Sequence, residues 1–377
     1  MSFLTIPFVD LYAQYLSIKT EIDEAIAGVI SKSAFVRGEY VDQFEDTFAQ
    51  LLGVNHCISC GNGTDALYIA MKGLGVKPGD EVITTAHSWI STSETITQAG
   101  GTVIFCDTDN STFTISPDEI GSKITDRTVG IIPVHLYGQP ADMDPIMSIA
   151  QKHGLWVIED CAQAHLTRYK GQLVGTIGQI GTFSFYPGKN LGAMGDAGCL
   201  VTQDTKLANW CSLYARHGGK GYHKIEGINS RMDGLQAAIL LTKLPYLPEW
   251  TRKRQALAKI YTQELNQLPG IITPYVGNNR DHVYHLYVIC IKNRNGLKQY
   301  LSTQGVATSI NYPKALPFYP AYAYLNHQIS DFPQAAAHQE QILSLPLYPE
   351  LTFEQIEYII NSIKDYLFDN PSPDLKC

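Results

Sequence analysis

Hydrophobic and polar positions follow two alternating periods along most of the chain. Residues 19–30 and 39–52 carry apolar side chains at helical spacing, and a turn at Arg37-Gly38 separates them. From residue 54 to about residue 215, apolar runs of strand length alternate with helical patterns. This alternation predicts an α/β fold in which helices cover both faces of a mostly parallel sheet.

The elements of this region can be placed from their lengths and turn residues. We expect strands at residues 54–59, 81–86, 102–107, 129–135, 155–160 and 182–186. We expect helices at residues 65–74, at 144–153, and after Ser116-Pro-Asp-Glu119, whose order is typical of a capping box. Ligands of parallel sheets bind beyond the carboxyl ends of the strands. The residues at or just past these ends include Trp89, His135, Asp160 and Lys189.

A second unit follows the alternating region. A helical pattern at residues 232–265 leads into short strands at 283–291, a helix at 295–304, a segment rich in Pro and Tyr at 311–325, and a last helix at 353–367. We therefore divide the chain into a large domain of residues 1–250 and a smaller α+β C-terminal domain of residues 251–377.

Composition narrows the class of protein. The chain has 377 residues, of which 45% are hydrophobic, and its formal net charge of −8 argues against nucleic acid as the main partner. No apolar run approaches the length of a membrane span, and the N-terminal sequence lacks the features of a signal peptide, so we expect a cytoplasmic protein. Cys57-Ile-Ser-Cys60 lies in an apolar strand pattern without a second pair, which favours buried thiols over a metal or redox site.

The stretch from Gly181 to Gly198 presents a single lysine, Lys189. Pro187-Gly188 breaks the strand that precedes it, and the glycine-rich run that follows leaves the backbone open to close approach. A lysine on such a turn suits a Schiff base, because partial desolvation lowers its pKa toward the working pH and the neutral amine attacks a carbonyl. The alternative is a surface lysine in a glycine-rich hairpin.

Further motifs fit a phosphate-bearing cofactor. Gly61-Asn-Gly-Thr-Asp-Ala66 follows a strand and opens a helix, so its backbone N–H groups form either an anion site or an ordinary helix cap. Asp160 closes an apolar strand, where its carboxylate either holds a protonated ring nitrogen of pyridoxal 5′-phosphate (PLP) or forms a cap or salt bridge. Trp89 is placed either to stack on a flat cofactor or to support the core.

A glycine-rich loop from Arg216 to Arg231 carries local positive charge in a chain that is acidic as a whole. Such a loop suits a diphosphate group, because positively charged side chains bind phosphate oxygens through charge-assisted hydrogen bonds. The alternative is a solvated surface loop without a ligand.

Taken in order, these motifs resemble the DegT/DnrJ/EryC1/StrS family of PLP-dependent nucleotide-sugar aminotransferases. The matching segments begin at Phe35-Val-Arg-Gly and end at Asn-Ser-Arg-Met-Asp233, and between them run Asn-Gly-Thr-Asp-Ala-Leu, Pro-Gly-Asp-Glu-Val-Ile, Pro-Val-His-Leu-Tyr-Gly, Glu-Asp-Cys-Ala-Gln-Ala and Ser-Phe-Tyr-Pro-Gly-Lys-Asn. The resemblance covers nearly the whole chain. It implies an aspartate-aminotransferase-like fold (PLP fold type I) with the cofactor site in the large domain.

The resemblance also implies a role for each matching residue. Lys189 matches the lysine that binds PLP covalently and moves the proton during catalysis. The other implied cofactor contacts are Asp160 for the pyridine nitrogen, Gln163 for the ring hydroxyl, Trp89 for stacking, Gly63, Thr64 and Ser184 for the phosphate, and Asn229 donated by the other subunit of a homodimer. The substrate-side candidates are Arg37, His135, Tyr186, Tyr222, His223 and Tyr312. No metal ligand is predicted.

The family implies a nucleotide-linked keto-sugar as substrate and L-glutamate as amino donor. Tyr-Pro-Gly-Lys-Asn-Leu-Gly-Ala is most similar to members that aminate C3 of a dTDP-linked 3-keto-6-deoxyhexose, which would supply an aminodeoxy sugar of a surface polysaccharide or glycosylated product. Two departures lie on the sugar side: Asn311, where members often have His, and Ser88-Trp-Ile90, where they often have Tyr or Phe. The alternatives are a UDP-linked or 4-keto sugar, a cyclitol, and a PLP-binding regulator without enzymatic activity.

Overall fold

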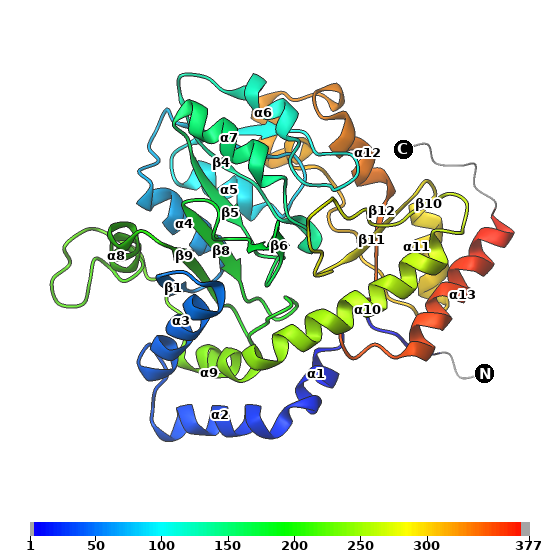
Figure 1. Ribbon diagram of the computed structural model, residues 1–377, viewed down its shortest axis with the longest axis horizontal. Coiled ribbons are helices and arrows are strands. Elements are labelled where there is room, and N and C mark those ends of the chain that lie inside the picture. The colour runs from blue at the N-terminus through cyan, green and yellow to red at the C-terminus, as the bar shows by residue number, and fades with distance from the viewer. Residues whose placement is uncertain (1–3, 371–377) are drawn as a thin grey trace.

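Residues 4–370 are described by a computed structural model, whose largest element is a seven-stranded sheet (Figure 1). From one edge to the other, its strands are β1 (His56–Cys60), β9 (Gly198–Thr202), β8 (Ile180–Ser184), β5 (Trp156–Asp160), β4 (Thr128–Ile132), β2 (Glu81–Thr85) and β3 (Thr102–Cys106). Within this sheet only β9 runs antiparallel to its neighbours. The predicted α/β fold with a mostly parallel sheet is therefore confirmed, and the carboxyl ends of β2, β4, β5 and β8 share one edge.

Side chains alternate between the two faces of the sheet, and helices cover both faces as predicted. Val157 of β5 belongs to one hydrophobic core together with Ile83, whereas the next residue, Ile158, belongs to a second core together with Val82. The first core includes residues of the helices α3 (Glu39–Leu52), α6 (Pro117–Lys123), α7 (Met143–His153) and α9 (Gly234–Lys243). The second core includes residues of the helices α4 (Gly63–Gly73), α5 (Ser91–Gln98) and α8 (Thr205–Tyr214).

A smaller unit packs beside the large sheet. The long helix α10 (Leu247–Leu265) leads into it, as Figure 1 shows. Its antiparallel sheet has the order β10 (Ile271–Ile272), β11 (Tyr287–Ile291) and β12 (Ile342–Leu345). With α10, the helices α11 (Arg294–Thr303) and α13 (Phe353–Asp369) enclose a third core. This unit has the predicted α+β character.

The packing crosses the predicted domain boundary in both directions. Ile6, near the start of the chain, packs in the core of the small unit, and Leu316 and Phe332 pack in the second core of the large sheet. The division at residue 250 therefore stays a prediction, since no single cut separates the cores. The remaining elements are α1 (Leu11–Ser17), α2 (Lys19–Ser31), β6 (Arg168–Tyr169), β7 (Gln172–Leu173), α12 (Pro333–Gln341) and the 3-10 helices η1 (Leu136–Gly138), η2 (Leu244–Tyr246), η3 (Leu316–Phe318), η4 (Pro320–Leu325) and η5 (Ile329–Asp331).

Two local predictions are wrong. The strand predicted to reach residue 135 ends at Ile132, so His135 lies in the loop that precedes η1. Ser116 is the N-cap residue of α6, but its side chain makes no capping hydrogen bond, so the capping box is absent there. Cys57 and Cys60 are buried in β1, as predicted. Among residues 4–370, no helix is both long and apolar enough to cross a membrane.

Candidate active site

Lys189 lies on a tight turn just beyond the carboxyl end of β8. The turn is closed by hydrogen bonds from Lys189 N to Tyr186 O (2.8 Å) and from Ala193 N to Phe185 O (2.7 Å). Gly192 is required here, since a Cβ atom would lie 2.2 Å from the carbonyl oxygen of Pro187. Burial lowers the pKa of the Lys189 amine to about 8, while the charge of the nearby Asp160 carboxylate acts in the opposite direction. The turn thus presents an amine that is partly neutral near physiological pH.

Helix α9 and the small unit fix this turn from two sides. The buried amine of Lys243 donates to Gly192 O (2.8 Å), and Gln236 Oε1 accepts from Met194 N (2.8 Å). Asn190, next to Lys189 in the chain, lies 3.2 Å from His285 Nδ1 through its Oδ1 atom. These contacts hold the backbone that carries Lys189, although none of them was predicted from the sequence.

Asp160 is the last residue of β5, which pairs in parallel with β8. Its side chain is 5% exposed, and its two oxygens accept hydrogen bonds from Thr92 Oγ1 (2.8 Å) and Ala162 N (3.1 Å). Burial raises the pKa of this carboxyl, whereas both hydrogen bonds and the positive charge of Lys189 act to lower it. The two predicted key residues therefore stand at the ends of adjacent strands and interact electrostatically.

The N-terminus of α4 supplies an anion site beside them. Asn62 caps the helix by accepting a hydrogen bond from Asp65 N (2.8 Å), and the helix begins at Gly63. A Cβ atom on Gly63 would lie 2.7 Å from Ser184 Cβ, so only glycine allows the helix end to approach β8 this closely. The hydroxyls of Thr64 and Ser184 and free helix N–H groups thus form a donor set that fits a phosphate.

Trp89 and Gln163 both contact Tyr312, whose phenol group interacts electrostatically with Asp160. The rings of Trp89 and Tyr312 have centroids 5.5 Å apart, and Trp89 is 57% exposed, so its indole face is open to a flat ligand. Gln163 donates from Nε2 to Tyr312 OH (2.9 Å) and accepts from Tyr137 N (2.6 Å), which leaves one amide N–H free for a ligand. Together with Lys189, Asp160 and the phosphate donors, this arrangement fits PLP.

His135 is placed away from any open surface. Its Nδ1 atom accepts from Ala141 N (3.0 Å), so Nε2 carries the proton and donates to Glu159 Oε2 (3.0 Å). The buried Glu159 also accepts from the backbone N–H groups of Gly175, Ile177 and Gly178. His135, Glu159 and Cys161 are close enough to hold a metal ion, but these hydrogen bonds already occupy both carboxylate oxygens and both imidazole nitrogens. The geometry therefore favours a structural role for His135 over its predicted contact with substrate.

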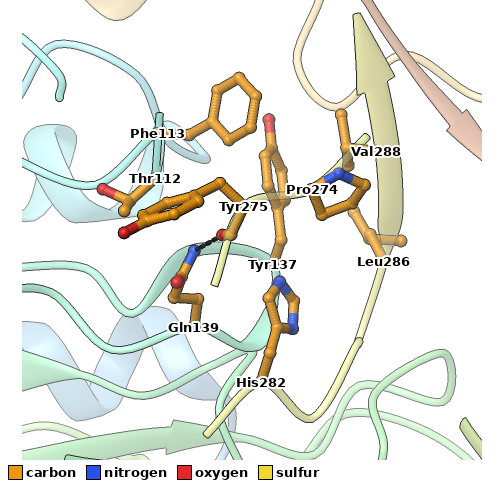
Figure 2. A pocket seen from close by; sticks show the side chains of 9 residues that line it. All are labelled: Thr112, Phe113, Tyr137, Gln139, Pro274, Tyr275, His282, Leu286 and Val288. Carbon is orange, nitrogen blue, oxygen red and sulfur yellow. Dashed lines mark hydrogen bonds between the residues drawn. The ribbon is translucent and has the colours of Figure 1, made fainter. Parts of the chain in front are cut away.

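A small cavity lies where η1 meets the small unit (Figure 2). Tyr137 and Gln139 line it from the large unit, and Tyr275 and His282 are among the residues that line it from the small unit. Gln139 Nε2 donates to Tyr275 O (3.0 Å), which ties the two units together. The cavity has a volume of about 10 Å³, which is enough for a single water molecule and too small for a cofactor or a sugar.

Four further predicted substrate residues and the predicted phosphate ligand Asn229 lie in loops, and most of them are exposed. Arg37 forms ion pairs with Glu45 (3.2 Å) and Asp42 (3.3 Å) on α3. Tyr186 is 59% exposed, and Tyr222 is 83% exposed, on the loop that Figure 1 shows extending outward after α8. His223 and Asn229 lie on the same loop, also exposed.

The sequence analysis missed the hydroxyl groups that support the site from α5. Ser91 Oγ lies 2.7 Å from Thr64 Oγ1, and Thr92 contacts Asp160 as described above. The run of Ser and Thr that follows Trp89 was the available signal, because hydroxyl side chains at the start of a helix beyond a strand end lie at the ligand-binding edge of the sheet.

Comparison with known proteins gives consistent matches over almost the full length. A family model described as the DegT/DnrJ/EryC1/StrS aminotransferase family matches residues 16–364. A Geobacillus stearothermophilus protein named pleiotropic regulatory protein is 43% identical over 367 residues, which cover 96% of this chain and 99% of that protein. The dTDP-3-amino-3,4,6-trideoxy-alpha-D-glucose transaminase of Streptomyces venezuelae is 38% identical over 363 residues and 96% of both chains.

A third relative and a solved structure extend these matches. The UDP-2-acetamido-2-deoxy-3-oxo-D-glucuronate aminotransferase of Pseudomonas aeruginosa is 41% identical over 356 residues, or 94% of this chain and 98% of that enzyme. The crystal structure of S. venezuelae DesV in complex with a ketimine intermediate superposes with a TM-score of 0.94 at 38% identity, covering 96% of this chain and 98% of that one.

Proposed function

Since the chain belongs to the DegT/DnrJ/EryC1/StrS aminotransferase family, we propose that it transfers the amino group of L-glutamate to C3 of a dTDP-linked 3-keto-6-deoxyhexose. Members of this family are PLP-dependent aminotransferases, so the chain is an enzyme of that class with PLP as its cofactor. The observation that carries the proposal is the juxtaposition of Lys189 and Asp160 at adjacent strand ends, beside an anion site at the N-terminus of α4.

PLP supplies an electron sink for the negative charge that develops on a reacting carbon atom. In our proposal Asp160 keeps a proton on the pyridine nitrogen, Gln163 binds the ring hydroxyl, and Gly63, Thr64 and Ser184 bind the phosphate. Lys189 Nζ removes the proton from the α-carbon of glutamate and later delivers a proton to C3 of the sugar. One amine serves both half-reactions, since both substrates bind at the same position relative to Lys189.

The choice of sugar is supported by the relatives. The S. venezuelae enzyme is named for a 3-amino sugar linked to dTDP, and the P. aeruginosa enzyme is named for a 3-oxo sugar linked to UDP. Both names place the reacting carbon at C3, which favours C3 over C4, while the nucleotide differs. A UDP-linked sugar is therefore the first alternative, followed by a 4-keto sugar and a cyclitol.

A regulator without enzymatic activity is the non-enzyme alternative, and the name of the G. stearothermophilus relative gives it some weight. Lys189 and Asp160 weigh against it. A lysine with a lowered pKa beside a buried carboxylate is typical of a catalytic site, which favours the enzyme.

We further propose that the active unit is a homodimer whose sites are shared. Asn229 is exposed, and large apolar side chains are exposed on three segments of the large unit: Phe35 and Val36, Trp89, and Tyr186 and Met194. A second copy that covered this surface would remove it from water and bring Asn229 to the opposite phosphate site. Cytoplasmic location is part of the same proposal, supported by buried free thiols such as those of Cys57 and Cys60.

A visible spectrum followed by a substrate panel tests the proposal. Protein purified with PLP should show the absorption of the lysine-bound cofactor, and L-glutamate should convert it to the pyridoxamine form. The aminated protein is then mixed with dTDP- and UDP-linked 3-keto and 4-keto sugars, and return of the original spectrum reports transfer. We expect the fastest return with the dTDP-linked 3-keto-6-deoxyhexose. A spectrum that glutamate does not change, with any sugar, would favour the regulator.

A further inference from the structure

Two consecutive hydrogen bonds connect a buried hydroxyl pair to the carboxylate at the centre of the site. Thr92, in the first turn of α5, is 1% exposed, and Ser88, just before the helix, is 3% exposed. Thr92 Oγ1 lies 2.8 Å from Asp160 Oδ2, and Ser88 Oγ lies 3.2 Å from Thr92 Oγ1. The other carboxylate oxygen accepts from Ala162 N at 3.1 Å.

The direction of these hydrogen bonds follows from the chemistry of the groups. An ionised carboxylate only accepts hydrogen bonds, and a threonine hydroxyl has one hydrogen to donate. Thr92 therefore donates to Asp160, and Ser88 must donate to the oxygen of Thr92. A hydroxyl that itself accepts a hydrogen bond is polarised, which strengthens its own donation to the next acceptor.

These hydrogen bonds favour the ionised form of the Asp160 carboxyl group, whereas its burial favours the neutral form. Asp160 is almost fully buried, and burial raises its pKa, while the hydrogen bond from Thr92 is the largest of the effects that lower it. The other titratable side chains that interact electrostatically with Asp160 are Lys189, His135, Tyr312 and Cys161. Among these groups only Lys189 and His135 lower the pKa of Asp160.

The same helical turn also touches the phosphate donors. Ser91 Oγ is 2.7 Å from Thr64 Oγ1, so the adjacent residues Ser91 and Thr92 contact the groups proposed to hold the two ends of PLP. A threonine that only satisfied its own polar group would bond back to a helix carbonyl. Thr95, one turn further along α5, does so by donating to Ser91 O (2.7 Å).

We propose that Thr92 is a positioning residue which, supported by Ser88, keeps the Asp160 carboxylate ionised and aimed at the pyridine nitrogen of bound PLP. This inference rests on the role proposed above for Asp160. Protonation of the pyridine nitrogen depends on an anionic partner, so a less anionic Asp160 would leave the ring with less positive charge. The nitrogen that links Lys189 to the bound cofactor would then lose its proton only at higher pH, and the pH midpoint of the visible band would rise.

The experiment compares four variants of the PLP-loaded protein with the wild type. T92V keeps the shape but removes the hydroxyl, T92S keeps the hydroxyl, and T95V is the matched control on the same helix. D160N removes the charge that Thr92 is proposed to support. For each protein we measure the dissociation constant of PLP and the pH midpoint of the visible band.

We expect T92V to weaken PLP binding about tenfold and to move the pH midpoint upward by about one unit, since a hydrogen bond to a charged group contributes about a factor of ten. T92S should restore both values, and T95V should leave the midpoint unchanged. If T92V and T95V share the wild-type midpoint while D160N shifts it, this inference is overturned and the role of Asp160 stands. If D160N also leaves the midpoint unchanged, the role of Asp160 fails together with the inference.

If T92V does not fold, the variant S88A tests the same inference. S88A removes only the outer hydroxyl, so Thr92 still donates to Asp160 but less strongly. We expect a midpoint shift in the same direction as in T92V and about a third as large. An unshifted midpoint in S88A, with the protein folded and loaded with PLP, would then overturn the inference.

Discussion

The cofactor side and the sugar side of this site are built in different ways. On the cofactor side, Asp160 and Gln163 are 5% exposed and each makes two hydrogen bonds within the chain. On the proposed sugar side, Tyr222 is 83% exposed, and Arg37 pairs with acidic residues of α3. The side chains of the first region are held by buried contacts within one chain, whereas those of the second are more exposed.

This contrast has a physical reason. A cofactor that every turnover uses needs fixed charges and donors, and rigid strand ends supply them at little entropic cost. A sugar nucleotide has to enter and leave, so its contacts are drawn from loops that a partner chain can cover. The difference predicts that mutations on the two sides affect different quantities, and that some sugar-side and phosphate contacts come from the second subunit.

The largest expected effect tests whether two chains share each site. K189A should reduce multiple turnover by about a thousandfold or more, because it removes the proton-transferring amine, and N229A should reduce it about tenfold. When both variants are co-expressed with different tags, the purified heterodimer carries one site with both residues intact if the sites are shared. Its turnover should then be about half that of the wild type.

The heterodimer also has a clear contrary outcome. If Lys189 and Asn229 serve the same site within one chain, every site of the heterodimer carries one substitution, and turnover should stay near one-twentieth of the wild-type value. K152A, on the exposed end of α7, is the control for the loss of a lysine far from the site and should keep full activity.

The next effect is on stability, and it tests the rigidity of the cofactor side. Glu159 is fully buried and accepts hydrogen bonds from three backbone N–H groups and His135. E159Q places an NH₂ group against some of these donors, so the free energy of unfolding should fall by about 2–4 kcal/mol. Urea denaturation measures this, and E354Q, at an exposed position on α13, should change it by less than about 0.5 kcal/mol. A small change in E159Q would mean that the cofactor side is less constrained than its hydrogen bonds indicate.

The sequence predicted the repeating architecture well because its signals are local. Apolar runs and helical spacing located β2, β3 and β5 to within one residue at each end. The antiparallel strand β9 was not predicted, since it follows β8 across the glycine-rich turn, where the hydrophobic pattern is interrupted. Leu316 and Phe332 pack in the core of the large sheet although they lie far along the chain, and no local pattern can reveal such a contact.

The sequence supports a prediction of site residues where the proposed function requires a particular residue type. Lys189, Asp160 and Gly63 stand out through the turn, the strand end and the helix start that carry them. His135 lies past a strand end like the others, yet its ring is enclosed by Glu159 and Ala141, which a one-dimensional pattern does not show. Thr92 was missed although it stands in the run of Ser and Thr that follows Trp89, because the sequence does not show that its partner lies 68 positions away.

A pH dependence of stability tests the electrostatics of Lys189 itself. Burial lowers the pKa of Lys189 from 10.5 to about 8, so between these values the unfolded chain binds more protons than the folded, PLP-free protein. This contribution to the free energy of unfolding therefore rises with pH from about 8 to about 10.5 and is constant below that window. The difference in free energy of unfolding between wild type and K189M should grow by about 1–2 kcal/mol across this pH window. This is less than the pKa shift alone would give, because the side chain is only partly buried.

Lys243 offers the matched variant for this measurement. Burial also lowers its pKa to about 8, but it is a structural residue of α9, so K243M should show a pH dependence of the same sign. K152M should show none. If the difference in free energy of unfolding between wild type and K189M stays constant between pH 8 and 10, the pKa of Lys189 is not depressed. Its reactivity would then require another explanation.

The smallest effect is expected on the sugar side, at Tyr222. The side chain is 83% exposed, so Y222A should change the free energy of unfolding by less than about 0.5 kcal/mol. If the loop closes over the sugar nucleotide, the KM for the keto-sugar should rise several-fold, while the spectral half-reaction with glutamate keeps its rate. F368A, at an 88% exposed position on the small unit, should alter neither quantity. A loss of the glutamate half-reaction in Y222A would place Tyr222 on the cofactor side, and the division between a closed cofactor side and an open sugar side would have to be redrawn.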